Sequence, residues 1–269
     1  MTFIYRHVPA NCLNVKWPDS FGHYREASFT QIKHHWWWKL VQIFDKIRVL
    51  KEYPSPVLFL EEDHYVFPDI LHVLRLLVEE SNRKFPSANV FCLGNYQKQI
   101  AGNSHLMEKG DWLVNKYNLG FAFNRTVYSI IKSCERSFCS YDDYNWDWTL
   151  NYVATTCVPK RLSTISVKFS RVLHMGTCGT HVKKQQCNLA NEGAAAKQKL
   201  KALSPRLFPN SITVQRTARK AVKPKKSNGG WGDLRDKRLC LAISNGSQDI
   251  QTVLNNLQFS HIKMGEIAS

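Results

Sequence analysis

The sequence predicts an α/β fold with a mostly parallel sheet. Short apolar runs of the kind that form buried strands alternate with longer segments whose apolar residues recur every three or four positions. Strands that alternate with helices are typical of βαβ crossovers, which place the joined strands in parallel. The chain has 269 residues, of which 43% are hydrophobic and 12% aromatic, and this is ample material for a folded core.

The first expected element is a long amphipathic helix over residues 27–51. Its apolar positions recur at helical spacing: Phe29, Ile32, Trp36, Leu40, Ile43, Ile47 and Leu50. Three consecutive tryptophans at 36–38 cover more than half of the helix circumference, so we expect burial on two sides. Core packing of these indoles is favoured over stacking on a cofactor.

A buried strand is expected over residues 57–60, and the carboxylates of Glu61, Glu62 and Asp63 follow it directly. In open α/β sheets, ligands bind at the carboxyl ends of the strands. Adjacent carboxylates repel one another unless a cation or a set of donors holds them, and hard divalent cations take oxygen ligands. This stretch alone is compatible with a metal site and with an exposed acidic turn.

The next elements complete a crossover. A helix that begins at a proline is expected over 68–82, and an apolar strand over 88–94. Another short strand is expected over 119–123, followed by a helix through about residue 134.

Residues 141–153 interleave acids with large aromatic side chains. A sugar site needs aromatic faces for the apolar side of a ring and carboxylates for its hydroxyls. The same mixture suits a partly exposed helix start, because acids are favoured near the positive end of the helix dipole. Farther on, His174 falls where an expected strand runs into a glycine-containing loop, and a lone histidine in such a place is more often a hydrogen-bonded structural residue than a ligand.

A net charge of +16 normally raises nucleic acid as a partner, but the distribution of the charge argues against it here. Six of the positive charges lie in residues 216–226 beside a proline, which favours an exposed loop, and no nucleic-acid module signature accompanies them. The eight cysteines include no CxxC pair, so disulfides or unrelated buried thiols are expected. No apolar run approaches the ~20 residues that span a bilayer.

Five stretches are similar to one family: SFGHYREA at 20–27, KHHWWWKL at 33–40, LFLEEDHY at 58–65, YDDYNWDWTL at 141–150 and NGGWGDLRD at 228–236. Together they resemble the N-acetylglucosaminyltransferase II family of Golgi N-glycan processing. The resemblance implies a catalytic domain of the GT-A fold over residues 1–240, with 241–269 as a tail without resemblance. It also implies inverting transfer of GlcNAc from UDP-GlcNAc to the 2-hydroxyl of the α1,6-arm mannose of N-glycans, with Mn²⁺ as cofactor.

The resemblance assigns the metal and donor residues. Asp63 matches the last acid of the family's metal-binding triplet, and His174 matches the second protein ligand of the metal. Glu61 and Glu62 are then expected on the donor side. An oxygen and nitrogen ligand set of this kind is one that manganese accepts readily.

The resemblance also assigns the acceptor side. Asp147 matches the catalytic base, with Asp142 and Asp143 as rival carboxylates that spacing alone does not separate. The flanking Trp146 and Trp148 are expected to exclude water and shape the sugar pocket. Asn118 matches a family motif near the acceptor, although a role in the turn before the next strand is equally open.

The family's cysteine pattern implies three disulfides: Cys134 with Cys157, Cys139 with Cys240, and Cys178 with Cys187. Cys12 matches a bridged family cysteine whose partner lies upstream of this sequence, and Cys92 is extra and expected as a buried thiol.

The resemblance further implies that the family's opening strands, its uridine-contacting loop and its membrane anchor are missing from this chain. We therefore expect the chain as written to be inactive, and membrane association in the Golgi to need an anchor that it lacks. A catalytically dead glycan-binding domain and a polyanion-binding module are the alternatives. Retention of Asp63, His174 and Asp147 together favours the enzyme.

Overall fold

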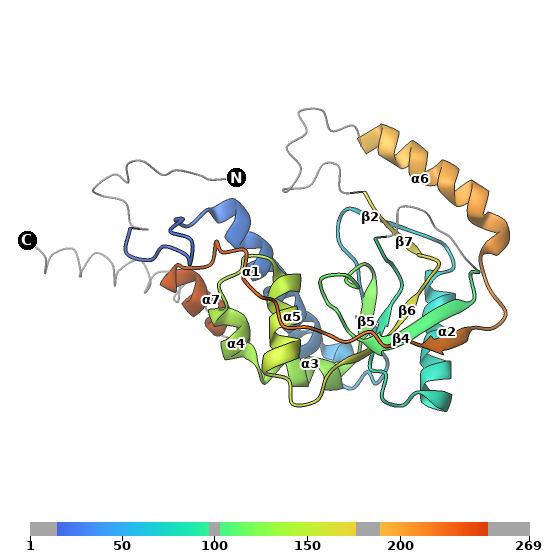
Figure 1. Ribbon diagram of the computed structural model, residues 1–269, viewed down its shortest axis with the longest axis horizontal. Coiled ribbons are helices and arrows are strands. Elements are labelled where there is room, and N and C mark those ends of the chain that lie inside the picture. The colour runs from blue at the N-terminus through green and yellow to red at the C-terminus, as the bar shows by residue number, and fades with distance from the viewer. Residues whose placement is uncertain (1–14, 97–102, 176–188, 247–269) are drawn as a thin grey trace, which may run out of the picture. The chain divides into compact units, whose positions relative to one another are not determined.

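The computed structural model describes residues 15–96, 103–175 and 189–246, which fold into two compact units (Figure 1). A helical unit combines Met1–Tyr53, Tyr128–Val158 and Lys223–Ser269. A sheet unit combines Pro54–Val127 and Pro159–Val222.

The sheet unit is built on six strands in the order β1-β5-β3-β6-β4-β8. Their bounds are β1 Val57–Phe59, β3 Val90–Cys92, β4 Leu106–Asp111, β5 Phe121–Phe123, β6 Ser163–Val167 and β8 Thr213–Arg216. The strands β3 and β6 pair in parallel, as do β4 and β8, whereas the three remaining neighbouring pairs are antiparallel.

This arrangement confirms the α/β class and corrects the expectation of a mostly parallel sheet, because the sheet is mixed. The strands β1 and β3 run in the same direction, as the predicted crossover requires. However, β5 lies between them and is antiparallel to both. The predicted crossover therefore joins two strands that run in the same direction, as expected. These two strands are not neighbours in the sheet, however, because β5 separates them.

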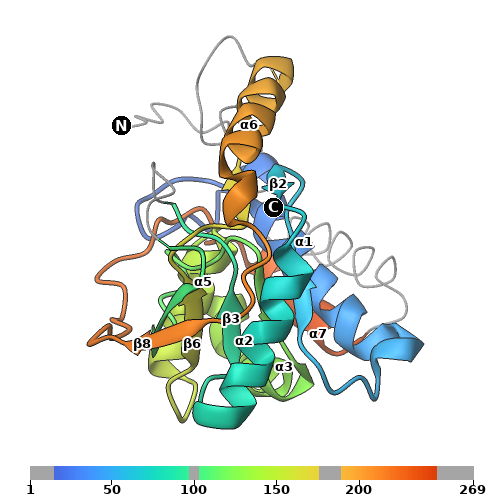
Figure 2. The same cartoon turned by 90° about the vertical axis from the view of Figure 1, so that its right-hand side faces the viewer.

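The crossover helix α2 (Ile70–Lys84) packs its apolar side against the sheet (Figure 2). Its residues Val73 and Leu77, one helical turn apart, belong to the same buried cluster as Phe91 of β3 and Ile165 of β6. The helix begins two residues after the predicted proline.

A second, two-stranded sheet in this unit pairs β2 (His64–Val66) with β7 (Val172–His174) in antiparallel fashion. The helix α6 (Leu189–Leu203) follows later in the chain and ends in a short 3₁₀ turn at Ser204–Arg206. The sequence patterns had not indicated β2 or α6.

The helical unit contains α1 (Ala27–Val41), α4 (Glu135–Ser140), α5 (Trp146–Thr156) and α7 (Leu234–Ser244). The helix α3 (Arg125–Lys132) follows β5, as predicted. The predicted 27–51 helix is therefore present as α1, and it continues as a π-helical turn over Gln42–Lys46 and a 3₁₀ turn over Arg48–Leu50.

The tryptophans of α1 serve mainly as core. Trp36 and Trp37 are buried, and Trp38 is exposed. Trp37 stacks on Phe138 and donates its indole N–H to the Ser244 hydroxyl at 2.8 Å. Packing is thus the role of two of the three indoles.

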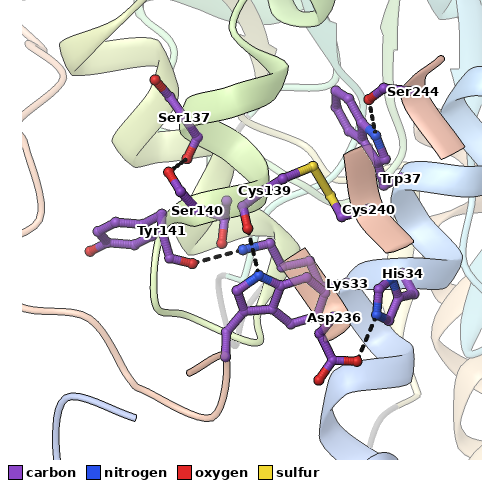
Figure 3. The surroundings of a disulfide bond; sticks show 12 residues. Lys33, His34, Trp37, Ser137, Cys139, Ser140, Tyr141, Asp236, Cys240 and Ser244 are labelled. Carbon is purple, nitrogen blue, oxygen red and sulfur yellow. Dashed lines mark hydrogen bonds and ion pairs between the residues drawn. A yellow bond between two sulfur atoms is a disulfide. The ribbon is translucent and has the colours of Figure 1, made fainter. Parts of the chain in front are cut away.

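Two of the three expected disulfides lie among the described residues, both in the helical unit. Cys134 and Cys157 bridge with their Cα atoms 6.0 Å apart. Cys139 of α4 and Cys240 of α7 bridge at a Cα separation of 5.6 Å (Figure 3). Disulfides of this kind persist in oxidising compartments.

The other cysteines divide in two groups. Cys12, Cys178 and Cys187 lie outside the described residues, so the third expected pairing stays a prediction. Cys92 is a buried free thiol, as expected, and burial raises its pKa to about 12.

Candidate functional site

The acidic triplet lies in the turn between β1 and β2, at the carboxyl end of β1 as predicted. Glu61, Asp63 and His64 each place one potential ligand atom in this turn, and these atoms all lie within 4.8 Å of one another. Side chains of these types at such separations have the spacing that a bound cation requires.

His174 reaches the same place from β7. In the two-stranded sheet His174 lies opposite His64, and the N–H of Met175 donates to the Asp63 carbonyl at 2.8 Å. The imidazole Nε2 of His174 is consequently only 3.1 Å from Asp63 Oδ2. The structure thus brings together the two residues that the resemblance singled out as metal ligands.

Each member of this pair shifts the titration of the other. The hydrogen bond to Asp63 raises the pKa of His174, and the same bond lowers the pKa of Asp63. Both side chains are 38% exposed, so the pair is open to an approaching ligand.

A divalent cation fits this donor set. One oxygen of Asp63 faces His174, whereas Oδ1 is buried without a hydrogen-bond partner among the described residues. A buried carboxylate oxygen of this kind lacks the partner that such atoms normally have. An ion held by carboxylate oxygen and imidazole nitrogen would satisfy it, and these are ligand types that manganese accepts.

His64 has a different part in the turn. Its Nδ1 accepts the backbone N–H of Glu61 at 3.1 Å, which leaves the ring proton of a neutral imidazole on Nε2. That Nε2 lies 3.8 Å from the Glu61 carboxylate. His64 therefore orients the turn and Glu61, and in this tautomer it offers no ring lone pair to a metal.

A pocket of about 390 Å³ adjoins His174. Its walls come from α6, from the end of β7 and from the segment after β3, and they include Tyr96, Glu192 and Lys199. The size is typical of small-molecule sites. Sequence reasoning missed these residues, because only the fold places α6 beside β7.

Asp142 and Asp143, the rivals of Asp147 for the role of catalytic base, both form hydrogen bonds that join loops of the helical unit. Asp143 is 0% exposed, and its carboxylate accepts four hydrogen bonds at 2.8–3.2 Å, two each from Asn145 and Asn228. Burial raises the pKa of Asp143. Asp142 accepts from the backbone N–H of Trp231 at 3.0 Å and from Ser20. Both carboxylates therefore hold loops together.

Asp147 differs from both. It lies half-buried in the first turn of α5, where its Oδ1 accepts the backbone N–H of the next residue at 2.9 Å. This matches the helix start that the sequence allowed. Among the three candidates, Asp147 is the carboxylate that lies in the first turn of a helix and is half-buried rather than fully buried like Asp143.

The expected acceptor residues Trp146 and Asn118 are both buried. Trp146 is 6% exposed and stacks on Trp36, with ring centroids 4.6 Å apart and planes 3° apart. This favours packing as its role, while the neighbouring Trp148 is exposed. Asn118 is 7% exposed in the loop before β5, so its placement fits the turn role and leaves the acceptor role a prediction.

Comparison with known proteins identifies the family. The family profile described as N-acetylglucosaminyltransferase II matches residues 6–240. An alpha-1,6-mannosyl-glycoprotein 2-beta-N-acetylglucosaminyltransferase of Sus scrofa is 40% identical over 232 residues, and the Homo sapiens protein of that name is 39% identical; each match covers 85% of this chain. The Arabidopsis thaliana protein of that name is 27% identical over 237 residues and 83% of this chain.

The chain spans about half the length of these relatives, 52% in each case. Within the described residues, none of the helices combines the length and apolarity needed to cross a membrane. A family profile that covers residues 6–240 extends over nearly all of the two described units. The chain therefore belongs to the N-acetylglucosaminyltransferase II family.

Proposed function

We propose that this chain carries the catalytic residues of a β-1,2-N-acetylglucosaminyltransferase of the GT-A type. The donor is UDP-GlcNAc, and the acceptor is the 2-hydroxyl of the α1,6-arm mannose of N-glycans in the Golgi lumen. Family membership supports this activity. The observation that carries it is the close approach of Asp63, in the turn between β1 and β2, and His174, at the end of β7.

Asp63 and His174 would hold Mn²⁺ in this proposal, and the spare buried oxygen of Asp63 supports that role. When bound, the ion would offset the charge that grows on the diphosphate of UDP as it leaves. Glu61 and Glu62 follow β1 in the same turn and are proposed to contact the donor.

Asp147 is proposed as the general base. It would take the proton from the mannose 2-hydroxyl as that oxygen bonds to C1 of GlcNAc and the bond from C1 to the UDP oxygen breaks. Attack from the face opposite UDP inverts the configuration at C1. The support is that both rival carboxylates are engaged in loop contacts, whereas Asp147 is half-buried at a helix start.

The test is transfer by the complete protein with UDP-GlcNAc, Mn²⁺ and a mannose-terminated N-glycan, with the product linkage read by NMR. We expect a β-1,2 linkage and a loss of about 10²-fold or more in turnover for Asp147→Asn. Glu135→Gln changes another first-turn carboxylate of the helical unit and is the matched control. Glycan binding without transfer would instead support the catalytically dead alternative.

A further inference from the structure

The amino group of Lys33 lies in the interior of the helical unit. Lys33 belongs to α1 and is 0% exposed. Its Nζ donates to the backbone carbonyls of Tyr141 at 2.9 Å and Asp143 at 3.1 Å, and the first of these bonds is drawn in Figure 3. The Trp231 ring centroid lies 4.3 Å from the same nitrogen. Burying an amine is costly, and burial holds the pKa of Lys33 well below its ordinary value.

The two carbonyls that Lys33 holds belong to the segment that leads into α5. The Asp143 carbonyl also accepts the Thr149 hydroxyl at 3.1 Å, and Thr149 lies in the first turns of α5. Thr149 in turn donates its N–H to the Asn145 carbonyl at 3.1 Å. The amino group of Lys33 and the hydroxyl of Thr149 at the start of α5 therefore donate to the same acceptor, the Asp143 carbonyl.

The side chain of Asp143 fixes the same segment from its other side. Its carboxylate accepts both the backbone and the side-chain N–H groups of Asn145, which is the N-cap residue of α5. It does the same for Asn228 in the loop that carries Trp231. Lys33 supplies two hydrogen bonds from α1 to the 141–143 segment, and a neutral apolar side chain there would leave two inward-pointing carbonyls without these donors.

We propose that Lys33 is a positioning residue for Asp147: by holding the carbonyls of Tyr141 and Asp143, it fixes the place and direction of the α5 start that presents the Asp147 carboxylate. The inference rests on the proposed function, because it assigns Asp147 a reacting proton. Fully connected buried polar networks of this kind define a single arrangement of the groups that they join.

The test combines Lys33→Met, which keeps the length of the side chain and removes its donors, with Thr149→Val, a near-isosteric change that removes only the shared hydroxyl contact. Ser244→Ala is the matched control. It removes a buried hydrogen bond between α7 and Trp37 in the same unit and leaves the 141–149 segment untouched (Figure 3).

The first readout is amide hydrogen exchange, which needs no turnover. We expect faster exchange over residues 144–150 in both variants and wild-type exchange there in Ser244→Ala. The second readout is steady-state kinetics of the complete protein. Small misplacements of a reacting group are costly, so we expect kcat to fall about 10-fold or more while KM for UDP-GlcNAc stays within about twofold.

Wild-type exchange over residues 144–150 in both variants would overturn the proposal, and so would faster exchange with unchanged kcat. If Lys33→Met does not fold, Thr149→Val decides by the same criteria. A wild-type protein that transfers no GlcNAc would refute the proposed function instead, and the exchange data then decide whether Lys33 holds the α5 start.

Discussion

Asp143→Asn should mainly lower the stability of the protein, whereas Asp147→Asn should mainly lower its turnover. Asp143→Asn turns one buried carboxylate oxygen into an amide nitrogen. Whichever oxygen is replaced, two N–H donors, from either Asn145 or Asn228, face another donor in place of an acceptor. Asp147→Asn changes a half-buried group at a helix start.

The magnitudes follow from these contacts. Hydrogen bonds to a charged group contribute about 1.5–3 kcal/mol each, so losing two costs roughly 3–6 kcal/mol. Removing a buried charge offsets part of this loss, since burial disfavours the ionised form and raises the pKa of Asp143. We expect a net loss of about 2–4 kcal/mol in the free energy of unfolding. For Asp147→Asn we expect a loss below about 1 kcal/mol, the size of a helix-dipole contribution.

Urea unfolding followed by circular dichroism gives both free energies, and turnover is measured on the same samples at a temperature where both variants are folded. Asp143→Asn should be clearly destabilised, whereas Asp147→Asn should stay stable and lose about 10²-fold or more in turnover. If Asp143→Asn is as stable as wild type and loses turnover alone, then Asp143 is the base and the distinction drawn from burial and hydrogen bonding is refuted.

Three further predictions concern stability and reactivity. Replacing both Cys139 and Cys240 by alanine should lower the free energy of unfolding by up to about 4.7 kcal/mol in the chain-entropy model for a sequence separation of 101, measured by urea unfolding; an unchanged midpoint contradicts this. Burial acts to raise the pKa of Asp236, but hydrogen bonds from His34 and Arg25 outweigh it and lower the pKa below its ordinary value. Asp236→Asn should therefore be less stable than wild type at pH 7, and the difference should begin to shrink only below about pH 3.9, the pKa of an aspartate in the unfolded chain, and close as the pH falls through the lower folded-state pKa; a gap that stays constant down to low pH contradicts the assignment. Native protein should leave Cys92 unlabelled by iodoacetamide at pH 8, since its pKa of about 12 keeps it a thiol, and peptide mapping should find it labelled only after unfolding.

Local patterns were sufficient to predict several elements of the fold. The apolar runs that become β1, β3 and β5 are each short and continuous, and α2 has the apolar period that buries Val73 and Leu77. The order of strands in the sheet did not follow, because the insertion of β5 between β1 and β3 depends on pairing between distant segments. The order of strands along the chain gives their order in the sheet only where strands that are consecutive in sequence also pair with each other.

The candidate site was predictable in part and for similar reasons. The position of Asp63 at the end of β1 follows from the strand pattern, but its approach to His174 depends on the pairing of β2 with β7 and was expected only from the family resemblance. Spacing did not separate Asp147 from Asp143, because the partner that engages Asp143, Asn228, lies far along the chain. Trp146 has an aromatic ring of the kind that sugars stack on, yet this ring packs on Trp36. Only the fold distinguishes a sugar-binding tryptophan from a core tryptophan here.

The pairing of Asp63 with His174 is the centre of this account, and Mn²⁺-dependent binding of UDP tests it most directly. Isothermal titration of the complete protein with UDP, with and without Mn²⁺, should be repeated for Asp63→Ala, His174→Ala and the control His105→Ala, another histidine of the sheet unit. We expect UDP affinity to depend on Mn²⁺ in wild type and in His105→Ala, and to lose that dependence in the other two variants. Mn²⁺-dependent affinity that is unchanged in both Asp63→Ala and His174→Ala would contradict the assignment.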